Sequence, residues 1–275
     1  MLIREYSLPA GWYPRDSQGV SQFLSNFNRC DLLSRAAIAP HAGWFYSGRI
    51  AARAVCALEL QAETIAVLGG HLPSGAPPLF AMEDSVKTPL GPMLIDAELR
   101  SLLKNELNGA EDRFRDNTVE ALLPMVRFFF PNAMLLWLRL PAEIMSFESG
   151  RKIFLAAEKL NRKVNVLGST DLTHYGPNYG FSPRGTGAAA LRWVREINDA
   201  NFINAVESGL GGEVLSRAEQ DSSACSAGAV LGAMGFAQEA KSGAAHLLEY
   251  ATSADVNGDD DIPDSFVGYA ALAFN

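Results

Sequence analysis

The stretch TIAVLGGH, residues 64–71, joins a short apolar run to two glycines and a histidine. Apolar runs of this length, bounded by turn residues, predict buried β-strands, so we expect a strand at 64–68. Outward from it, similar runs predict strands at 36–39, 133–138, 164–167 and 265–274, the last after a polar turn at 257–261.

Helical patterns lie between these strands. Apolar residues recur at helical spacing in five segments, namely 48–60, 97–107, 147–160, 188–208 and 223–240. Strands that alternate with helices predict an α/β fold, with a mostly parallel or mixed central sheet flanked by helices. The sequence shows no linker, internal repeat or low-complexity tract, so we expect a single domain over residues 1–275.

The composition of the chain argues against two classes of partner, nucleic acids and membranes. The chain is 48% apolar and 20% charged, as is typical of globular proteins, and its formal net charge is -8. Nucleic-acid binding needs clustered Lys and Arg, so this charge argues against such a partner. Arginines and prolines interrupt the most apolar stretch, 122–145, so we expect no membrane span. The first residues lack the apolar core of a signal peptide, and we expect a cytoplasmic protein.

The three cysteines are odd in number and widely spaced, which does not predict a disulfide framework. We interpret Cys30 and Cys56 as ordinary core or surface thiols. Cys225, in DSSACSAGAV, falls at the expected start of a helix that Asp221 or Ser222 could cap. A helix start favours the thiolate, which binds metals or attacks electrophiles. The other interpretation of Cys225 is a small buried apolar residue.

Three of the four histidines directly follow predicted strands: His41 after AAIAP, His71 after TIAVLGG and His174 after VNVLGSTDLT. In open α/β sheets, the loops beyond the carboxyl ends of the strands form the ligand crevice. Neutral imidazole is a common metal ligand. One such histidine alone would more often be structural, but three together predict a shared site. His246, in AAHLLEY, lacks this setting and is interpreted as a packing or surface residue.

Two acidic residues are further candidates. Asp171 and His174 form a D-x-x-H pair beyond a strand, where the carboxylate can orient the imidazole or act with it as a general acid and base. The alternative for Asp171 is a helix N-cap. Glu120 is the one acid in the apolar run NTVEALLP, and it either lines a site or faces solvent. The acidic stretch 255–261 lacks the spacing of a calcium loop and is interpreted as a solvated turn.

Five blocks of the sequence resemble a known family. They are APHAGWFYSG (39–48), GSTDLTHYG (168–176), DSSACSAGAV (221–230), LLEYATSADV (247–256) and SFVGYAALAF (265–274). In this order they resemble the Memo family (AmmeMemoRadiSam system protein B), which is similar in fold to the LigB-like class III extradiol dioxygenases. The resemblance covers nearly the whole chain.

The resemblance implies an α/β fold with a site at one end of the sheet. It implies that His41, His71 and Cys225 hold one metal ion, and that Asp171 and His174 line the same pocket. The extradiol enzymes hold non-haem Fe(II) with two histidines and a carboxylate. Because a cysteine replaces that carboxylate here, we expect Fe(II) first, with copper and zinc as alternatives. The resemblance also implies AMMECR-type or radical-enzyme partners.

The sequence departs from the family at two places. Asn117 stands where the family commonly has a histidine, before a segment in which Glu120 is kept. The segment LPSGAPPLF after His71 lacks the second polar residue that the family often has there. An asparagine can hydrogen-bond but cannot transfer a proton near neutral pH. A degenerate site with a binding function is therefore an alternative.

Three functions fit these residues. The first is a metal-dependent oxidoreductase of the extradiol-dioxygenase-like kind, in which the metal binds dioxygen or a small oxygenated substrate and His174, oriented by Asp171, moves a proton. The second is a non-catalytic adaptor that binds a peptide or small ligand with exposed aromatic residues, namely Trp44, Phe45, Tyr46, Tyr175 and Tyr179. The third is a zinc hydrolase. The expected pocket residues are Asn117, Glu120, Trp44 and Tyr46.

Overall fold

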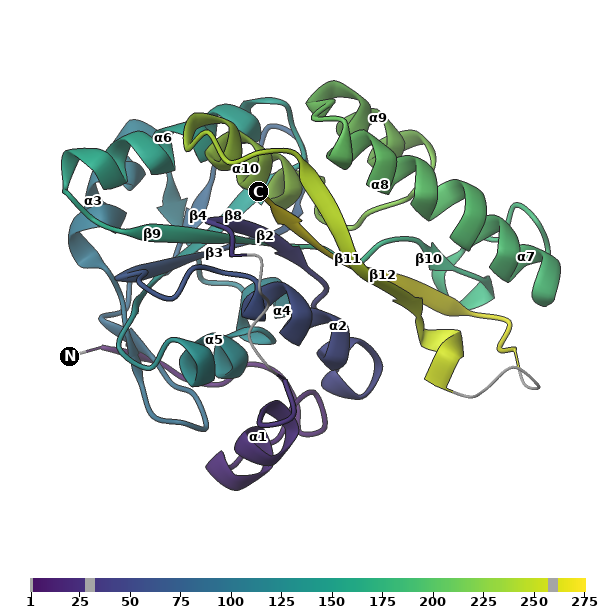
Figure 1. Ribbon diagram of the computed structural model, residues 1–275, viewed down its shortest axis with the longest axis horizontal. Helices are drawn as coiled ribbons and strands as arrows, with labels where there is room; N and C mark the ends of the chain where they lie inside the picture. The colour runs from purple at the N-terminus through teal and green to yellow at the C-terminus, as the bar shows by residue number, and fades with distance from the viewer. Residues whose placement is uncertain (1, 28–32, 257–261) are drawn as a thin grey trace.

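A mixed sheet with helices on both faces runs through the computed structural model (Figure 1). The structure describes residues 2–27, 33–256 and 262–275. Cys30 and the expected turn at 257–261 lie outside the described residues. The described part forms a single α/β unit, in which the sheet separates two large hydrophobic clusters.

The larger sheet has nine strands among the described residues. They are β2 (Ala36–Ala39), β3 (Thr64–Leu72), β4 (Leu79–Phe80), β7 (Ala110–Glu111), β8 (Met134–Pro141), β9 (Val164–Ser169), β10 (His174–Tyr175), β11 (Ala245–Thr252) and β12 (Phe266–Phe274). Their spatial order is β10-β12-β2-β9-β3-β8-β4-β7, with β11 also paired to β12. The central strands β2, β9, β3 and β8 are parallel, so the loops that follow them meet at one edge of the sheet.

Helices cover both faces of this sheet (Figure 1). One layer contains α3 (Ala97–Glu106), α6 (Met145–Lys159), α8 (Asp199–Glu207), α9 (Gly211–Gln220) and α10 (Ala227–Glu239). The other contains α1 (Ser17–Leu24), α2 (Trp44–Cys56), α4 (Asn117–Glu120) and α5 (Leu123–Phe129). Outside these layers, α7 (Ala188–Trp193) packs beside β10, and a π-helical turn, Val194–Asn198, joins it to α8. A small second sheet contains β1 (Ile3–Arg4), β5 (Ser85–Val86) and β6 (Met93–Leu94).

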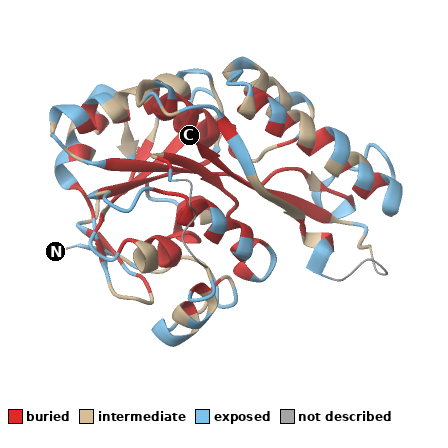
Figure 2. Cartoon of the chain, viewed as in Figure 1, coloured by how far each residue is buried: buried red, intermediate tan, exposed pale blue. Residues whose placement is uncertain are grey.

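Neighbouring residues of the central strands point to opposite layers. In β2, Ala36 and Ile38 belong to the cluster that contains α10, whereas Ala37 and Ala39 belong to the cluster that contains α2. The central strands are therefore buried on both faces, as Figure 2 shows. This double burial explains why the sequence shows continuous apolar runs there instead of alternation.

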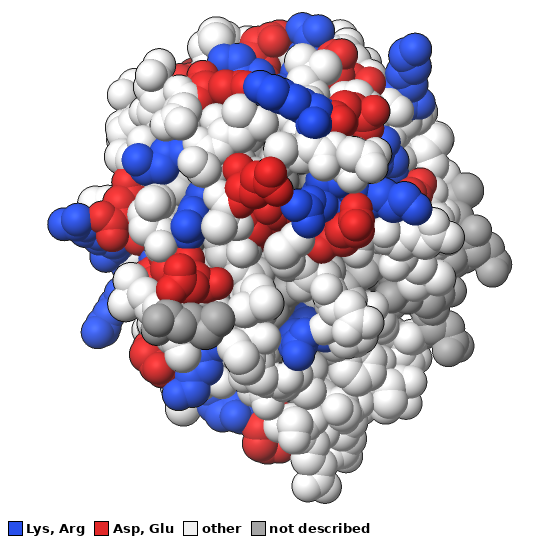
Figure 3. Space-filling view, turned by 90° about the vertical axis from the view of Figure 1, so that its left-hand side faces the viewer, with Lys and Arg blue, Asp and Glu red and all other residues white. Residues whose placement is uncertain are grey.

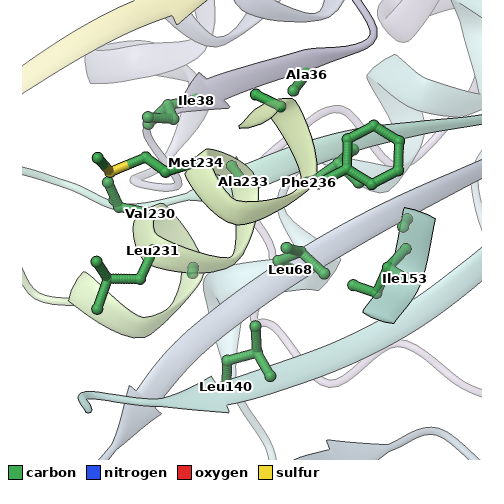
Figure 4. Close-up of a cluster of buried hydrophobic side chains, with 14 of the residues drawn as sticks. Ala36, Ile38, Leu68, Leu140, Ile153, Val230, Leu231, Ala233, Met234 and Phe236 are labelled. Atoms are coloured by element: carbon green, nitrogen blue, oxygen red, sulfur yellow. The ribbon is translucent and has the colours of Figure 1, made fainter. Parts of the chain in front are cut away.

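Helix α10 is buried along almost its whole length and packs on the central strands (Figure 4). Val230 and Phe236 lie in one hydrophobic cluster with Leu68 of β3. Each such buried side chain contributes roughly 1.5–3 kcal/mol. Helices α10 and α6 approach so closely that a Cβ atom added at Gly150 would lie 1.9 Å from the Gly232 carbonyl oxygen. Any larger residue at position 150 would force these helices apart.

The predicted α/β fold and all five predicted strands are present. Strands β3 and β8 run further toward their carboxyl ends than the expected 64–68 and 133–138. Helices α1 and α9 and strand β11 were not predicted, and neither were the short helices α4 and α5 or the two-residue strands. In β11 a register shift between Leu247 and Glu249 breaks the alternation that would have marked a strand.

Two helix starts were wrong. The helix expected from residue 48 begins at Trp44, because Gly43 turns the chain directly into the first helical hydrogen bonds. The helix expected from residue 223 begins only at Ala227. Cys225 therefore precedes α10, and its backbone N–H donates to the Asp171 carbonyl oxygen instead of entering the helix. The helix also has no side-chain cap from Asp221 or Ser222.

Charged side chains of both signs share the surface. On the face in Figure 3, Lys and Arg lie among Asp and Glu. Among the described residues, no helix is both long and apolar enough to cross a lipid bilayer.

Candidate metal centre

The predicted ligands meet at the carboxyl edge of the parallel strands. His41 follows β2, His71 lies near the end of β3, and Cys225 comes from the loop before α10. One ligand atom from each of the three lies within 4.8 Å of the others. The structure therefore brings together three side chains that are up to 184 positions apart in the sequence.

His41 is fully buried, and both of its ring nitrogens have partners. Its Nδ1 atom lies 2.8 Å from the Ser169 hydroxyl, at the end of β9. Its backbone N–H donates to Asp171 Oδ1 at 2.7 Å. These two contacts aim the Nε2 atom at the Cys225 sulfur, 3.4 Å away.

His71 is held in an unusual backbone conformation. Its φ of 56° lies in the left-handed region, which non-glycine residues seldom occupy. The register between β3 and β8 shifts at the same place, between Gly69 and Leu72. The ring Nδ1–H donates to Asp116 Oδ2 at 3.0 Å, which leaves Nε2 for a ligand. The His71 ring stands nearly perpendicular to that of His41, with 5.2 Å between centroids.

The separation of two of the three donor atoms fits a metal ion. Metal–nitrogen bonds of about 2.0 Å and metal–sulfur bonds of about 2.3 Å at a tetrahedral angle place nitrogen and sulfur about 3.5 Å apart. The observed separation of 3.4 Å between His41 Nε2 and Cys225 Sγ matches this value. Both histidines also have the second partner on Nδ1 that metal-binding imidazoles usually have.

The charges of the cluster favour a thiolate. Burial raises the pKa of Cys225, but Coulombic attraction and hydrogen bonds from His41 and His71 outweigh burial and hold this pKa well below its usual range. Burial lowers the pKa of His71, but hydrogen bonds with Asp116 and the cysteine raise it to about 10. Burial likewise raises the pKa of Asp116, but its contacts with His71, Thr118 and Arg139 lower it to about 2. These shifts favour a thiolate at Cys225 beside a protonated His71.

Asp171 lies between two imidazoles. Its Oδ2 atom is 3.9 Å from His41 Nε2 and 3.8 Å from His174 Nε2. Burial lowers the pKa of His174, and the Asp171 carboxylate raises it above its ordinary value. The His174 ring stacks on Tyr179, with 5.1 Å between centroids. The structure thus places the predicted Asp171–His174 pair directly beside His41.

A cavity of about 530 Å³ opens beside this cluster. Asp171 and His174 form its wall nearest the predicted ligands, together with Asn117, whose amide donates to the His41 carbonyl oxygen at 3.3 Å. Other lining residues are Trp12, Tyr46, Asn178, Tyr179, Ser253, Ser265 and Tyr269. The cavity can therefore hold a small molecule within reach of the His174 imidazole and several hydroxyl groups.

A family model described as "Memo-like protein" matches residues 4–273. The chain belongs to the Memo-like family. It is similar to MEMO1 family proteins of Pyrococcus abyssi (29% identical over 293 residues, 98% of this chain and 99% of that one) and Thermococcus onnurineus (28% over 302 residues, 99% of both). A crystal structure of an uncharacterized protein from Escherichia coli K12 superposes with a TM-score of 0.48 at 11% identity, over 86% of this chain and 99% of that one.

Some predicted pocket residues of this Memo-like chain lie elsewhere. Glu120 does not line the cavity; its carboxylate accepts hydrogen bonds from the backbone of Ser7 and Leu8 and from the Tyr13 hydroxyl. It therefore fastens the N-terminal segment, which in turn carries Trp12 to the cavity.

The expectation that Trp44 and Tyr175 are exposed was wrong. Trp44 is 4% exposed, and its Nε1–H donates to the Ala121 carbonyl oxygen at 2.9 Å. Tyr175 is fully buried and stacks on Phe266. Local sequence does not show which segments will cover an aromatic ring. Phe45, Tyr46 and Tyr179 are exposed as predicted.

The groups that hold the candidate ligands of the Memo-like site were not predicted from the sequence. Ser169 and Asp116 contact the two imidazoles, and Arg139 contacts Asp116. Ser169 and Arg139 both lie just beyond the ends of predicted strands, so their positions could have indicated a function. Asp116 carried no such local signal, because its contact with His71 depends on how α4 packs against β3.

Proposed function

We propose that this Memo-like protein binds one metal ion through His41, His71 and Cys225, and that it acts as an oxidoreductase related to the class III extradiol dioxygenases. The main support for this proposal is that the three ligand atoms lie within 4.8 Å of one another, beside a cavity of about 530 Å³. The reaction site would be the part of the cavity next to Asp171 and His174.

The proposed metal is Fe(II), and copper and zinc are the alternatives that the thiolate makes competitive. When bound, the metal would supply Lewis-acid or redox chemistry to a small oxygenated substrate. Zinc at full occupancy together with ester or amide hydrolysis would instead point to a hydrolase.

The side chains around the cavity would transfer protons and orient the groups that take part in the reaction. His174 accepts or delivers a proton through its imidazole, and the Asp171 carboxylate holds that ring and favours its protonated form. Asn117 donates a hydrogen bond and fixes the loop after β2, but it moves no proton. Tyr179 stacks on His174 and limits the rotation of its ring.

Metal analysis of the purified chain tests this proposal. We expect about one metal ion per chain in the wild type, and a strong loss in His41→Ala and Cys225→Ala. The matched control is His246→Ala, since His246 is an exposed histidine of β11 and lies outside the cluster. A wild-type chain that takes up neither iron, copper nor zinc would refute the proposal. Turnover of phenolic and other oxygenated substrates that is lost in His174→Gln, with metal retained, would support the catalytic part.

Two exposed rings at the start of α2, one of which lines the cavity, favour a second candidate, a peptide- or ligand-binding adaptor. Phe45 is 70% exposed and Tyr46 is 50% exposed, and the two rings pack edge to face. Aromatic rings in this state supply contact area to a partner. Under this alternative, Phe45→Ala weakens partner binding although the metal content is unchanged, and His174→Gln affects nothing.

A further inference from the structure

Strand β8 buries an arginine in its apolar run MLLWLRLP. Arg139 is only 3% exposed. A guanidinium group cannot lose its charge in a protein, so burying it is costly unless every part of it is paired. The groups that pair with Arg139 therefore indicate its function in the fold.

The Arg139 guanidinium holds three acceptors at once. Its Nε–H donates to the Gly70 carbonyl oxygen at 3.0 Å. One terminal nitrogen lies 3.3 Å from Asp112 Oδ1, and the other lies 3.2 Å from Asp116 Oδ2. The strand register sets this position, because Arg139 lies directly opposite Gly69 of β3. Gly69 has no side chain to displace the arginine stem; a Cβ there would lie 3.0 Å from Arg139 Cγ.

Two of these three acceptors belong to the surroundings of His71. Gly70 is the residue before His71, and Asp116 Oδ2 is the same atom that accepts the His71 Nδ1–H. Arg139 thus holds His71 in place in two ways, through the backbone carbonyl of the preceding residue and through the carboxylate that binds the imidazole. A strained backbone such as that of His71 persists only when its surroundings fix it from several sides.

The third acceptor, Asp112, connects Arg139 to the N-terminal strand β1. The Asp112 carboxylate also accepts the Trp137 Nε1–H at 2.9 Å. Arg4 of β1 donates to the Asp112 carbonyl oxygen at 2.9 Å and lies 4.5 Å above the Trp137 ring. Asp112 and Asp116 therefore face the buried arginine from two sides, and Arg4 adds a second positive charge behind Asp112.

The geometry points to Arg139 as the positioning residue of the metal centre. It holds the Gly70 carbonyl and the Asp116 carboxylate so that His71 keeps Nδ1–H as a donor and presents Nε2 toward Cys225. This function rests on the proposed metal site. It assigns to that site a residue, Arg139, that would not itself bind the metal. The competing explanation is that Arg139 serves only as a counterion that stabilises Asp112 inside the fold.

Metal binding separates the two explanations, with Co(II) as the probe because its visible spectrum reports ligand geometry. Loss of a group that orients a metal-binding histidine typically lowers metal affinity by 10–100-fold. We expect Arg139→Gln to lower Co(II) affinity by about that factor and to change the spectrum. The matched control is Arg162→Gln, which also removes contacts with two carboxylates, those of Asp96 and Glu98, but lies outside the cluster. The control should bind Co(II) as the wild type does.

A double-mutant comparison shows whether Arg139 acts through His71. In a His71→Ala background, Arg139→Gln should cause no further loss of Co(II) affinity, because the residue that it positions is gone. An equal loss in both backgrounds would overturn the inference. If Arg139→Gln does not fold, Arg139→Lys takes its place, since an ammonium keeps the charge but cannot bridge the three acceptors. A folded variant with wild-type affinity and spectrum refutes the inference alone, whereas a wild-type chain that binds no metal refutes the proposed function as well.

Discussion

Metal binding at pH 9 should release about one proton from His71, in addition to any proton that His41 gives up, because the pKa of both rings is raised. At its pKa of about 10, His71 is roughly 90% protonated at pH 9, and a metal must displace this proton from the ring. The pKa of Cys225 lies well below its usual range, so the sulfur should release less proton than an ordinary thiol would. With ordinary values of about 8.5 for cysteine and 6.5 for histidine, the same site would release only about 0.25 proton, nearly all from the thiol.

Calorimetric titration of the chain with Zn(II), in buffers of different ionisation enthalpy, measures this number directly. The apparent affinity should also rise about tenfold per pH unit as long as His71 alone must be deprotonated. Asp116→Asn removes the carboxylate that raises the His71 pKa, so proton release at pH 9 should fall. His246→Ala should behave like the wild type. A release of about 0.25 proton, abolished by Cys225→Ala and unaffected by Asp116→Asn, would show that the assignment of charges is wrong.

Three further changes test the fold around the site. Gly150→Ala should lower the free energy of unfolding in urea by about 1–3 kcal/mol, because the added Cβ would lie 1.9 Å from the Gly232 carbonyl oxygen; a smaller effect would mean that α6 and α10 can separate freely. Burial raises the pKa of Asp199 to about 6 despite hydrogen bonds from Thr173 and Tyr250. The folded state therefore binds a proton at Asp199 more tightly than the unfolded state does. This contribution to stability is fully present below the unfolded pKa and is lost as the pH rises through 6. Relative to Asp199→Asn, the wild type should lose about 2–3 kcal/mol between pH 3.5 and 7.5, and parallel profiles would contradict this. Glu120→Gln should speed proteolytic cleavage before residue 16, because the N-terminal segment loses a charged acceptor; unchanged cleavage would show that Glu120 does not fasten it.

The positions of the candidate ligands at the sheet edge could be predicted because they follow from a local rule. A histidine just after a buried parallel strand must lie at the carboxyl edge of the sheet, and β2 and β3 both end that way. Asp171 and His174 follow β9 for the same reason. Cys225 needed the resemblance to a family as well, because only the packing of the loop before α10 against the end of β9 brings its sulfur to His41.

The groups that hold these ligands depend on pairings between distant segments. Arg139 reaches Asp116 because β8 lies beside β3 in one particular register. Trp44 is buried because the N-terminal segment and α5 pack over it, which no pattern within α2 reveals. A single sequence thus predicts which residues stand at strand ends, but not which side chains cover or orient them.

The sheet and its loops position the candidate ligands of this site without a metal. Ser169 and Asp116 already occupy the Nδ1 atoms of the two imidazoles, and the backbone of Asp171 already anchors the residue that carries the thiol. In small zinc domains the metal itself supplies the folding energy, and its removal unfolds the chain. Here the buried layers on both sides of the sheet supply that energy, so a chelated chain should keep its secondary structure and lose only the stabilisation that metal binding adds by mass action. Preorganisation of this kind would suit the proposed metal centre, because side chains that are already in place need not occupy a position that the metal keeps open.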